Sequence, residues 1–344
     1  MSTSPSTAPT TETVSIPLER PGAGRRVKAY LDGHRSLVGV AAIVLLLVLG
    51  GIIRPGFASA DNIGSLLAIA AILTLLACSQ VFVVVSGGEG IDLSVAAVAS
   101  MSAVLASMFL SRADGALGSA LAIGGVLLIA LVIGAVTGLA VAFARIPPLV
   151  MTLGMAQLIA GAVFAYTAGS APSSAPGWLA ELGAARAFGP VRWLVLVVAV
   201  LVVAGELWLR RTRSGRSLFL VGANDGAARL SGLRIRSIRL LAYTSASVTG
   251  AVAGILLLGS AGSAQLGMAD GYLLLSIAAV IIGGARFSGG EGSFAGAAIG
   301  AVLLTVLDSL LLVLGLGPGT RIAVQGAILL VLTLVYARER SLRS

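Results

Sequence analysis

Charged residues are scarce in this sequence: they make up 11% of its 344 positions, whereas hydrophobic residues make up 57%. With a mean hydropathy of +1.03, this composition excludes a soluble globular chain and is typical of a polytopic membrane protein. The formal net charge is +9. Because the basic residues are scattered among loop ends without aromatic residues between them, membrane topology accounts for this charge, and we expect no nucleic-acid partner.

Cysteine, histidine and lysine occur once each. Cys78 lies in an apolar run, so it can form no intrachain disulfide and is expected to be a small core residue. His34 has no cluster of potential ligands nearby, which argues against a metal site. No Gly-rich turn is followed by Lys and Ser/Thr, because Lys28 is the only lysine; the chain therefore has no Walker A loop. We expect no cofactor, no metal and no catalytic residue.

Ten apolar segments dominate the chain after a Ser-, Thr- and Pro-rich start, residues 1–13, that is typical of disorder. Most are near the roughly 20 residues that a spanning helix needs. The eighth is short, so it fits either a span or a re-entrant or broken helix. The segments are 37–53, 63–85, 91–110, 117–143, 149–166, 193–209, 240–260, 272–282, 294–314 and 322–336.

The stretch 210–239 is the only one of its length that a bilayer would reject, and its eight arginines place it in the cytoplasm by the positive-inside tendency. We assign successive loops to alternate sides of the membrane, starting from a cytoplasmic N-terminus. This assignment puts eighteen basic residues on the cytoplasmic side and five on the external side, which favours an even number of spans and two cytoplasmic termini. Within the stretch, Asn224 and Asp225 suit a helix start and Gly232 a helix end, so we predict a short helix outside the membrane. The five outside residues are Arg54, Arg112, Arg186, Arg192 and Arg321.

Ionisable residues near the predicted spans are functional candidates by default. Asp92 is expected to begin a helix beside Ser94 and to cap it, while direct contact with a substrate stays open. Asp308 lies well inside the ninth span, so its carboxylate should face the protein interior or a wet path. Gln80 is a weaker candidate of the same kind, and Glu206 lies near the end of the sixth span.

Glycine is abundant, with 45 residues, and a pentapeptide built on it occurs twice: Ser86-Gly-Gly-Glu-Gly90 and Ser288-Gly-Gly-Glu-Gly292. Both copies fall on the cytoplasmic side of the alternating assignment, where we expect flexible turns near a partner surface. A nucleotide-binding role fails because no Lys follows either copy. Other glycines predict close helix packing; they are Gly134 with Gly138, and Gly292, Gly296 and Gly300 on one helix face.

Three blocks of the chain are distinctive: residues 86–94 are SGGEGIDLS, residues 222–232 are GANDGAARLSG, and residues 278–292 are AAVIIGGARFSGGEG. In this order they resemble the GGIDLS turn, the coupling segment and the third conserved block of the ribose-type monosaccharide permeases of ABC importers, a family related to branched-chain amino-acid permeases. Residues 57–63, FASADNI, are similar to its first external loop. Glu89 departs from the pattern as an insertion. Gly226 weakens a helix, so the coupling helix starts either at Asn224 or after Gly226.

The resemblance implies an all-α, type II-like permease fold of about ten transmembrane helices in a bacterial plasma membrane. It divides the chain into a disordered, basic cytoplasmic tail (1–36), a permease domain (37–337, with coupling loop 210–239) and a cytoplasmic C-terminal tail (338–344). The chain would form the sugar pathway within the lipid bilayer. Its partners would be a second permease copy or paralogue, an extracytoplasmic sugar-binding protein, and cytoplasmic ATPases that hydrolyse ATP, so the chain itself would be no enzyme.

The same resemblance assigns the coupling residues, whereas the roles of individual side chains are inferred from their chemistry and the translocation candidates from their positions near the predicted spans. Arg229 suits acidic groups on the ATPase and Leu230 an apolar cleft. The coupling residues are Gly222, Asn224, Asp225, Ala227, Arg229, Leu230, Ser231 and Gly232. The candidates for a translocation or helix-cap role are Gln80, Gly88, Gly90, Asp92, Ser94 and Asp308.

Three other classes compete with this interpretation. A branched-chain amino-acid permease is the closest, because only the GGIDLS-like turn favours sugar. An ion-coupled secondary transporter needs its own membrane carboxylates, and only Asp308 lies deep enough. A membrane-embedded enzyme lacks clustered His, Cys or acidic pairs. The sequence leaves open which sugar is carried, which residues line its path, and whether the second permease is identical.

Overall fold

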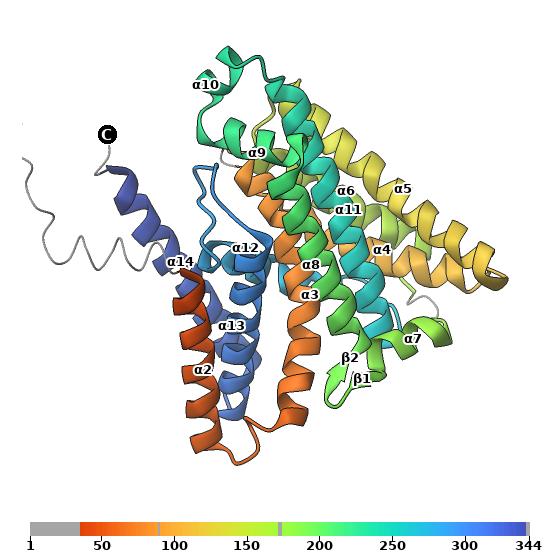
Figure 1. The fold of residues 1–344 in the computed structure, drawn as a ribbon. Coiled ribbons are helices and arrows are strands. Elements are labelled where there is room, and N and C mark those ends of the chain that lie inside the picture. Colours follow the sequence, from red (N-terminus) through yellow and green to blue (C-terminus); the bar gives the residue numbers. More distant parts are fainter. Residues whose placement is uncertain (1–34, 89, 171–173, 342–344) are drawn as a thin grey trace, which may run out of the picture. The chain divides into compact units, whose positions relative to one another are not determined.

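The computed structural model describes residues 35–88, 90–170 and 174–341, and these residues are overwhelmingly helical (Figure 1). The expected disordered tail, apart from its last two residues, and the inserted Glu89 lie outside the described residues. The only strands in the described part are β1 (Arg186–Phe188) and β2 (Val191–Arg192), which pair antiparallel. The architecture is therefore set by helix packing.

Each of the ten apolar segments forms a helix, because every backbone polar group in lipid must be satisfied within its own segment. In the described part of the chain, α3, α5, α6, α8, α11 and α13 are long and apolar enough to cross a membrane. The ten helices are α2 (Arg35–Ile53), α3 (Ala60–Val85), α4 (Val95–Leu110), α5 (Gly115–Ala142), α6 (Pro148–Thr167), α8 (Trp193–Arg211), α11 (Ile235–Ala261), α12 (Leu273–Ile282), α13 (Phe294–Val313) and α14 (Pro318–Ser341).

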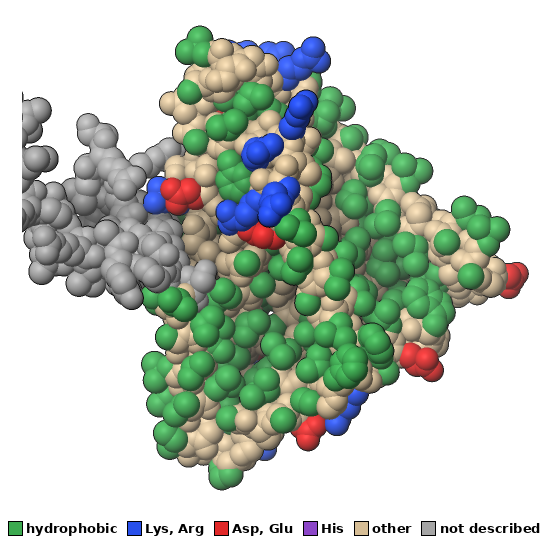
Figure 2. All heavy atoms as spheres, viewed as in Figure 1, with side chains coloured by type: hydrophobic (Ala, Val, Ile, Leu, Met, Phe, Trp, Pro, Cys, Tyr) green, Lys and Arg blue, Asp and Glu red, His purple; other side chains and the backbone are tan. Residues whose placement is uncertain are grey.

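The core lies around α3, whose residues are buried without a break from Ala70 to Val85. Cys78 is fully buried there, as expected of a small core residue. Helices α11, α12 and α13 pack against α3, whereas α5, α6 and α8 expose leucine and valine side chains. Figure 2 shows hydrophobic side chains covering the flank of the bundle. Such a flank is stable where lipid replaces water, since lipid tails are as apolar as leucine.

Short elements occupy the two ends of the bundle (Figure 1). Helices α9 (Arg213–Ala223) and α10 (Asp225–Leu230) lie at one end, which we call the α10 end. Helix α7 (Gly177–Ala184) and the two strands lie at the other, where Arg186 forms an ion pair with Asp61 (3.1 Å) beside the start of α3. Basic side chains gather near the α10 end (Figure 2).

Helix α12 is half the length of a spanning helix. Its ten residues, with the preceding 3₁₀ turn η1 (Asp270–Tyr272), extend about 21 Å, against a hydrocarbon thickness of about 30 Å. Residues 283–293, which follow it, are not helical. Of the two expectations for this segment, the broken helix fits the structure.

Glycines bring α12 and α13 into backbone contact. A Cβ atom on Gly296 would lie 2.1 Å from the carbonyl oxygen of Gly283, and one on Gly300 equally close to that of Ala279. The expectation that Gly292 shares this helix face is wrong. Ser293 is extended and its Oγ accepts the Gly296 N–H (2.9 Å), so α13 begins only at Phe294.

The second glycine pair behaves as predicted. A Cβ on Gly134 would lie 2.8 Å from the carbonyl oxygen of Tyr243, and one on Gly138 would lie 3.0 Å from Cα of Leu240. Both glycines are on α5 and both neighbours are on α11. Small residues thus allow these two long helices to approach closely.

Candidate functional site

Helix α9 lies across the bundle end because its sequence is amphipathic. Thr212 caps it by accepting the Gly215 N–H (3.0 Å), which satisfies one of the free amides of the first turn. Leu218 and Val221 are buried on its inner face, and Leu218 joins the same apolar cluster as Val85 of α3. The helix is thereby anchored to the core.

Helix α10 is the short helix predicted from the sequence, and it begins at Asp225. The Asn224 side chain accepts the Ala227 N–H (3.0 Å) and so caps it. The alternative start after Gly226 is wrong, since this cap offsets the low helix propensity of glycine.

The other end of α10 is also closed by its own residues. The Leu233 and Gly232 amides donate to the Ala228 and Arg229 carbonyls (3.1 and 3.0 Å), with Gly232 at a φ of +77°. This Schellman arrangement requires the left-handed conformation that glycine adopts without cost. Ser231, the C-terminal cap residue, donates through Oγ to the Ala227 carbonyl (3.0 Å).

One face of α10 is turned away from the bundle. Leu230 is 93% exposed and Arg229 is exposed beside it, whereas Ala228 is buried. The base of α10 is fixed by Asp225, which accepts a hydrogen bond from Arg239 of α11 (2.7 Å). The structure thus presents an arginine and a leucine on a rigid, capped helix.

The two SGGEG copies meet at Gly222, the last glycine of α9. The Gly290 N–H donates to the Val85 carbonyl (3.0 Å). A Cβ on Gly222 would lie 1.8 Å from that carbonyl oxygen and 2.6 Å from the Gly290 nitrogen, while one on Gly289 would lie 2.5 Å from Cα of Gly87. We call this backbone contact the glycine junction; it joins the turn after α3, the end of α9 and the turn before α13.

The two turns at the junction each contain a Gly-Gly pair with positive φ angles. Gly87 and Gly88 have φ values of +74° and +69°, and Gly289 and Gly290 have +89° and +75°. We expected flexible turns near a partner surface, but the structure packs the two copies against each other. Residues with side chains rarely adopt these angles, so the Gly-Gly pairs are required by the fold.

Asp92 lies behind the first turn and is buried. Its carboxylate accepts the Ser94 N–H (2.8 Å) and the Ser94 hydroxyl (2.6 Å). The Gln80 amide pairs with the Asp92 backbone in both directions, donating to its carbonyl (2.7 Å) and accepting its N–H (3.2 Å). The prediction that Asp92 begins a helix is therefore wrong: its backbone is held by Gln80, and α4 begins at Val95.

The remaining turn candidates have packing roles. A Cβ on Gly88 would lie 2.9 Å from the guanidinium of Arg239, and one on Gly90 would lie 2.9 Å from the Val83 carbonyl oxygen. Both positions thus require the absence of a side chain. The turn brings Gly88 next to the arginine that holds α10.

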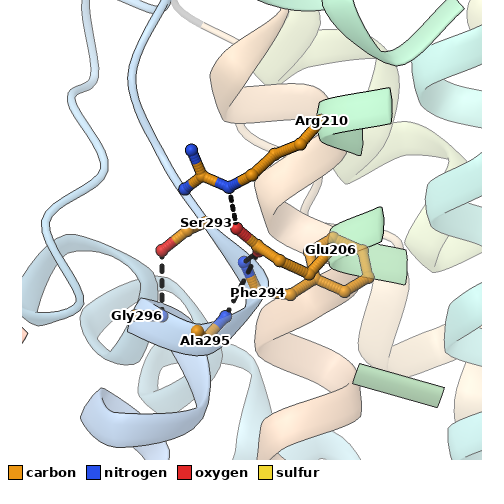
Figure 3. Close-up of polar contacts among 6 residues, drawn as sticks. All are labelled: Glu206, Arg210, Ser293, Phe294, Ala295 and Gly296. Atoms are coloured by element: carbon orange, nitrogen blue, oxygen red, sulfur yellow. Dashed lines mark hydrogen bonds and ion pairs between the residues drawn. The ribbon is translucent and has the colours of Figure 1, made fainter. Parts of the chain in front are cut away.

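Glu206 has a role that our sequence analysis missed (Figure 3). From α8 it accepts the backbone N–H groups of Phe294 (2.7 Å) and Ala295 (3.4 Å), and it pairs with Arg210 one turn further on. A carboxylate at a helix N-terminus is favoured by the free amides and by the helix dipole. Glu206 thus fastens the start of α13 to α8 at the α10 end.

Asp308 is not brought to this site. It lies on α13 in the part remote from the α10 end, and its carboxylate is bound by Arg321 and by Gln325 (2.8 Å), both from α14. Its Oδ1 also accepts from the Arg321 Nε at 2.9 Å. The expected interior position is thus stabilised by an ion pair between two helices.

Six helices of the described chain that are long and apolar enough to cross a membrane, with a capped helix outside the bundle, are typical of a membrane transport permease. The sequence matches the family described as "Branched-chain amino acid transport system / permease component" over residues 62–333. The chain belongs to this family.

Its relatives include permeases of import systems. The chain is 31% identical over 337 residues to the ribose import permease protein RbsC of Escherichia coli (strain K12), which covers 96% of this chain and all of the relative. It is 32% identical over 324 residues to the autoinducer 2 import system permease protein LsrC of Escherichia coli (strain SMS-3-5 / SECEC), covering 91% of this chain and 92% of that relative.

Proposed function

We propose that this chain is the transmembrane permease subunit of an ABC importer and forms the pathway for a monosaccharide that an extracytoplasmic binding protein delivers. The observation that carries the proposal is α10, a helix capped at both ends that exposes Arg229 and Leu230. Such a helix suits docking into a cleft of a partner ATPase, with Leu230 in an apolar pocket and Arg229 near acidic groups. The two relatives named for import support the class of system.

The substrate class rests on the relatives. One imports ribose and the other autoinducer 2, by their names, and both align over nearly the whole chain. The family's description names branched-chain amino acids, but neither of these two relatives is named for amino-acid import. A monosaccharide is therefore the substrate class that we assign to this chain.

For the topology we propose ten transmembrane segments in a bacterial plasma membrane, counting the broken helix α12 and the non-helical residues 283–293 that follow it as one segment, with both termini and the α10 end in the cytoplasm. The charge distribution supports this orientation: Arg145 and Arg286 in their connections, and the eight arginines between 210 and 239 in the short helices and helix ends, all belong to the α10 end. Loops rich in arginine stay on the cytoplasmic side.

For the mechanism we propose that closure of the ATPases moves α10, and that the glycine junction passes this movement to α4 and α13. Two contacts support the route: Arg239 holds Asp225 at the base of α10, and Gly222 touches Val85 and Gly290 directly. Gln80, Asp92 and Ser94 would act as positioning residues that hold the interrupted start of α4.

The permease would work as a pair, with a second copy or a paralogue. Helix α6 supports this because one of its exposed faces carries Gly154 and Gly161, with open space around both, and Gln157 between them. Small residues allow close helix approach, and a glutamine amide within the membrane gains a partner when a second helix covers it.

The coupling proposal can be tested by exchanging both exposed residues of α10 for alanine, R229A/L230A. We expect ribose uptake and ATPase co-purification to fall at least tenfold, with unchanged membrane insertion. The matched control is R213A/L220A, which removes an exposed arginine and an exposed leucine from α9. Undiminished uptake in R229A/L230A, or equal loss in the control, would contradict the proposal.

A secondary transporter is disfavoured by the geometry of its one credible carboxylate. Asp308 is neutralised by Arg321 and bound by Gln325, which leaves it poorly suited to bind and release a coupling ion. The purified chain alone in vesicles should accumulate no sugar under a proton or sodium gradient; accumulation would favour the secondary class.

A further inference from the structure

A basic cavity lies at the α10 end, and its lining includes Asp225 and Arg229 of α10 but not Leu230. Its volume is about 710 Å³, and it is enclosed by the turn after α3, the α5–α6 connection and the α10–α11 connection. Among the described residues, five arginines line it, against one carboxylate, that of Asp225. They are Arg145, Arg229, Arg234, Arg236 and Arg239.

Most of this positive charge is not neutralised within the described residues. Asp225 pairs with Arg239, whose Nε is nevertheless buried without a hydrogen-bond partner there. Arg236 lies over the Phe143 ring, 5.6 Å from its centroid, which orients its guanidinium without satisfying its charge. Arg145 and Arg234 are exposed at the cavity, and no carboxylate of the described residues pairs with either.

The cavity also has an apolar border. Phe143 and Ile146 are 46% and 37% exposed in the α5–α6 connection, and Leu149 and Val150 at the start of α6 are exposed as well. The border therefore continues directly into the hydrophobic flank formed by α6. Arginines beside apolar residues, where helices leave the hydrocarbon, match a molecule with a phosphate at one end and acyl chains at the other.

We infer that this cavity binds the phosphate of an anionic phospholipid from the leaflet that surrounds the α10 end. The planar guanidinium groups of Arg145, Arg234 and Arg236 suit the tetrahedral phosphate, since arginine forms paired hydrogen bonds with its oxygens. The acyl chains lie along Phe143, Ile146 and Leu149. These proposed phosphate and acyl-chain contacts leave out Arg229 and Leu230, the two residues assigned to the ATPase contact.

The test uses the purified full-length chain and native mass spectrometry to count bound phosphatidylglycerol, with phosphatidylcholine as the neutral comparison. The test variant is R145N/R234Q/R236Q; asparagine is chosen at 145 because this position has a φ of +59°, which asparagine tolerates. The control variant is R211Q/R213Q/R216Q, which removes three exposed arginines from the same end outside the cavity. Both variants carry the same net charge.

We expect wild type and control to retain one phosphatidylglycerol, and the test variant to bind it on the order of 100-fold more weakly, the loss expected from removing three cations near a lipid phosphate. Equal weakening in both variants would overturn the inference in favour of general charge attraction. Displacement of the lipid by millimolar inorganic phosphate would overturn the lipid assignment in favour of a free phosphate site. Loss of ATPase co-purification in the test variant, with lipid binding intact, would overturn it in favour of a protein interface.

Discussion

Replacement of Gly222 by alanine should open the glycine junction. The added Cβ would lie 1.8 Å from the Val85 carbonyl oxygen and 2.6 Å from the Gly290 nitrogen, both backbone atoms that no rotamer change can move away. Overpacking of this kind costs about 1–3 kcal/mol. The Gly290–Val85 hydrogen bond, about 1 kcal/mol, would be lost with it. Together these effects weaken the junction by about 2–4 kcal/mol.

Hydrogen exchange measures this weakening without reference to transport. The Gly290 amide should exchange roughly 30- to 1000-fold faster in G222A, because local opening becomes easier by the same free energy. Sugar uptake should fall as well, since the movement of α10 would no longer reach α4 and α13.

The matched control is the same substitution four residues further on, G226A. A Cβ there meets only the Asn224 Oδ1, at 3.2 Å, and alanine favours the helix by about 0.8–1.0 kcal/mol. Protection of the Gly290 amide should then equal that of wild type. Unchanged protection in G222A would refute the argument that the junction is close-packed.

Three further substitutions probe the contacts around the site. E206Q should lower stability by about 1–2 kcal/mol, because the amides of Phe294 and Ala295 lose their anionic partner; an unchanged midpoint of thermal unfolding in detergent would contradict this. D308N should cost about 2–3 kcal/mol by leaving Arg321 unpaired, and D308N/R321Q should recover part of the loss in the same assay; no recovery would argue against the pairing. Q80L should cost about 1–3 kcal/mol and expose the Asp92 amide to exchange, and a protected amide would speak against the paired contact.

Much of the helical framework could be predicted from the sequence because its signals are local. Apolar runs indicate helices wherever lipid or a buried core surrounds them, and each predicted segment overlaps one helix. The cap at Asn224 and the stop at Gly232 are equally local, since each depends on residues within one turn. For the same reason α10 was predictable to within one residue.

The contacts between distant segments were not predictable in this way. Glu206 holds an amide 88 positions away, and no composition or spacing marks it as the cap of α13. The two SGGEG copies were recognisable in the sequence. Their role in the glycine junction was not, because it depends on both turns lying at the α10 end and touching Gly222. At Asp92 a local pattern gave a wrong prediction. The sequence predicted that a helix starts there, but Gln80 of α3 binds the backbone of Asp92 and holds it outside the helix.

The glycine junction also has a mechanical consequence. A contact between side chains can accommodate a small shift of one helix, because the side chains can change rotamer. A contact between main-chain atoms cannot accommodate the shift in this way. Three segments of this chain meet through main-chain atoms at Val85, Gly222 and Gly290. The glycine junction is therefore stiff. A displacement of α9 must be accommodated by rigid rotation of the helices next to the two turns.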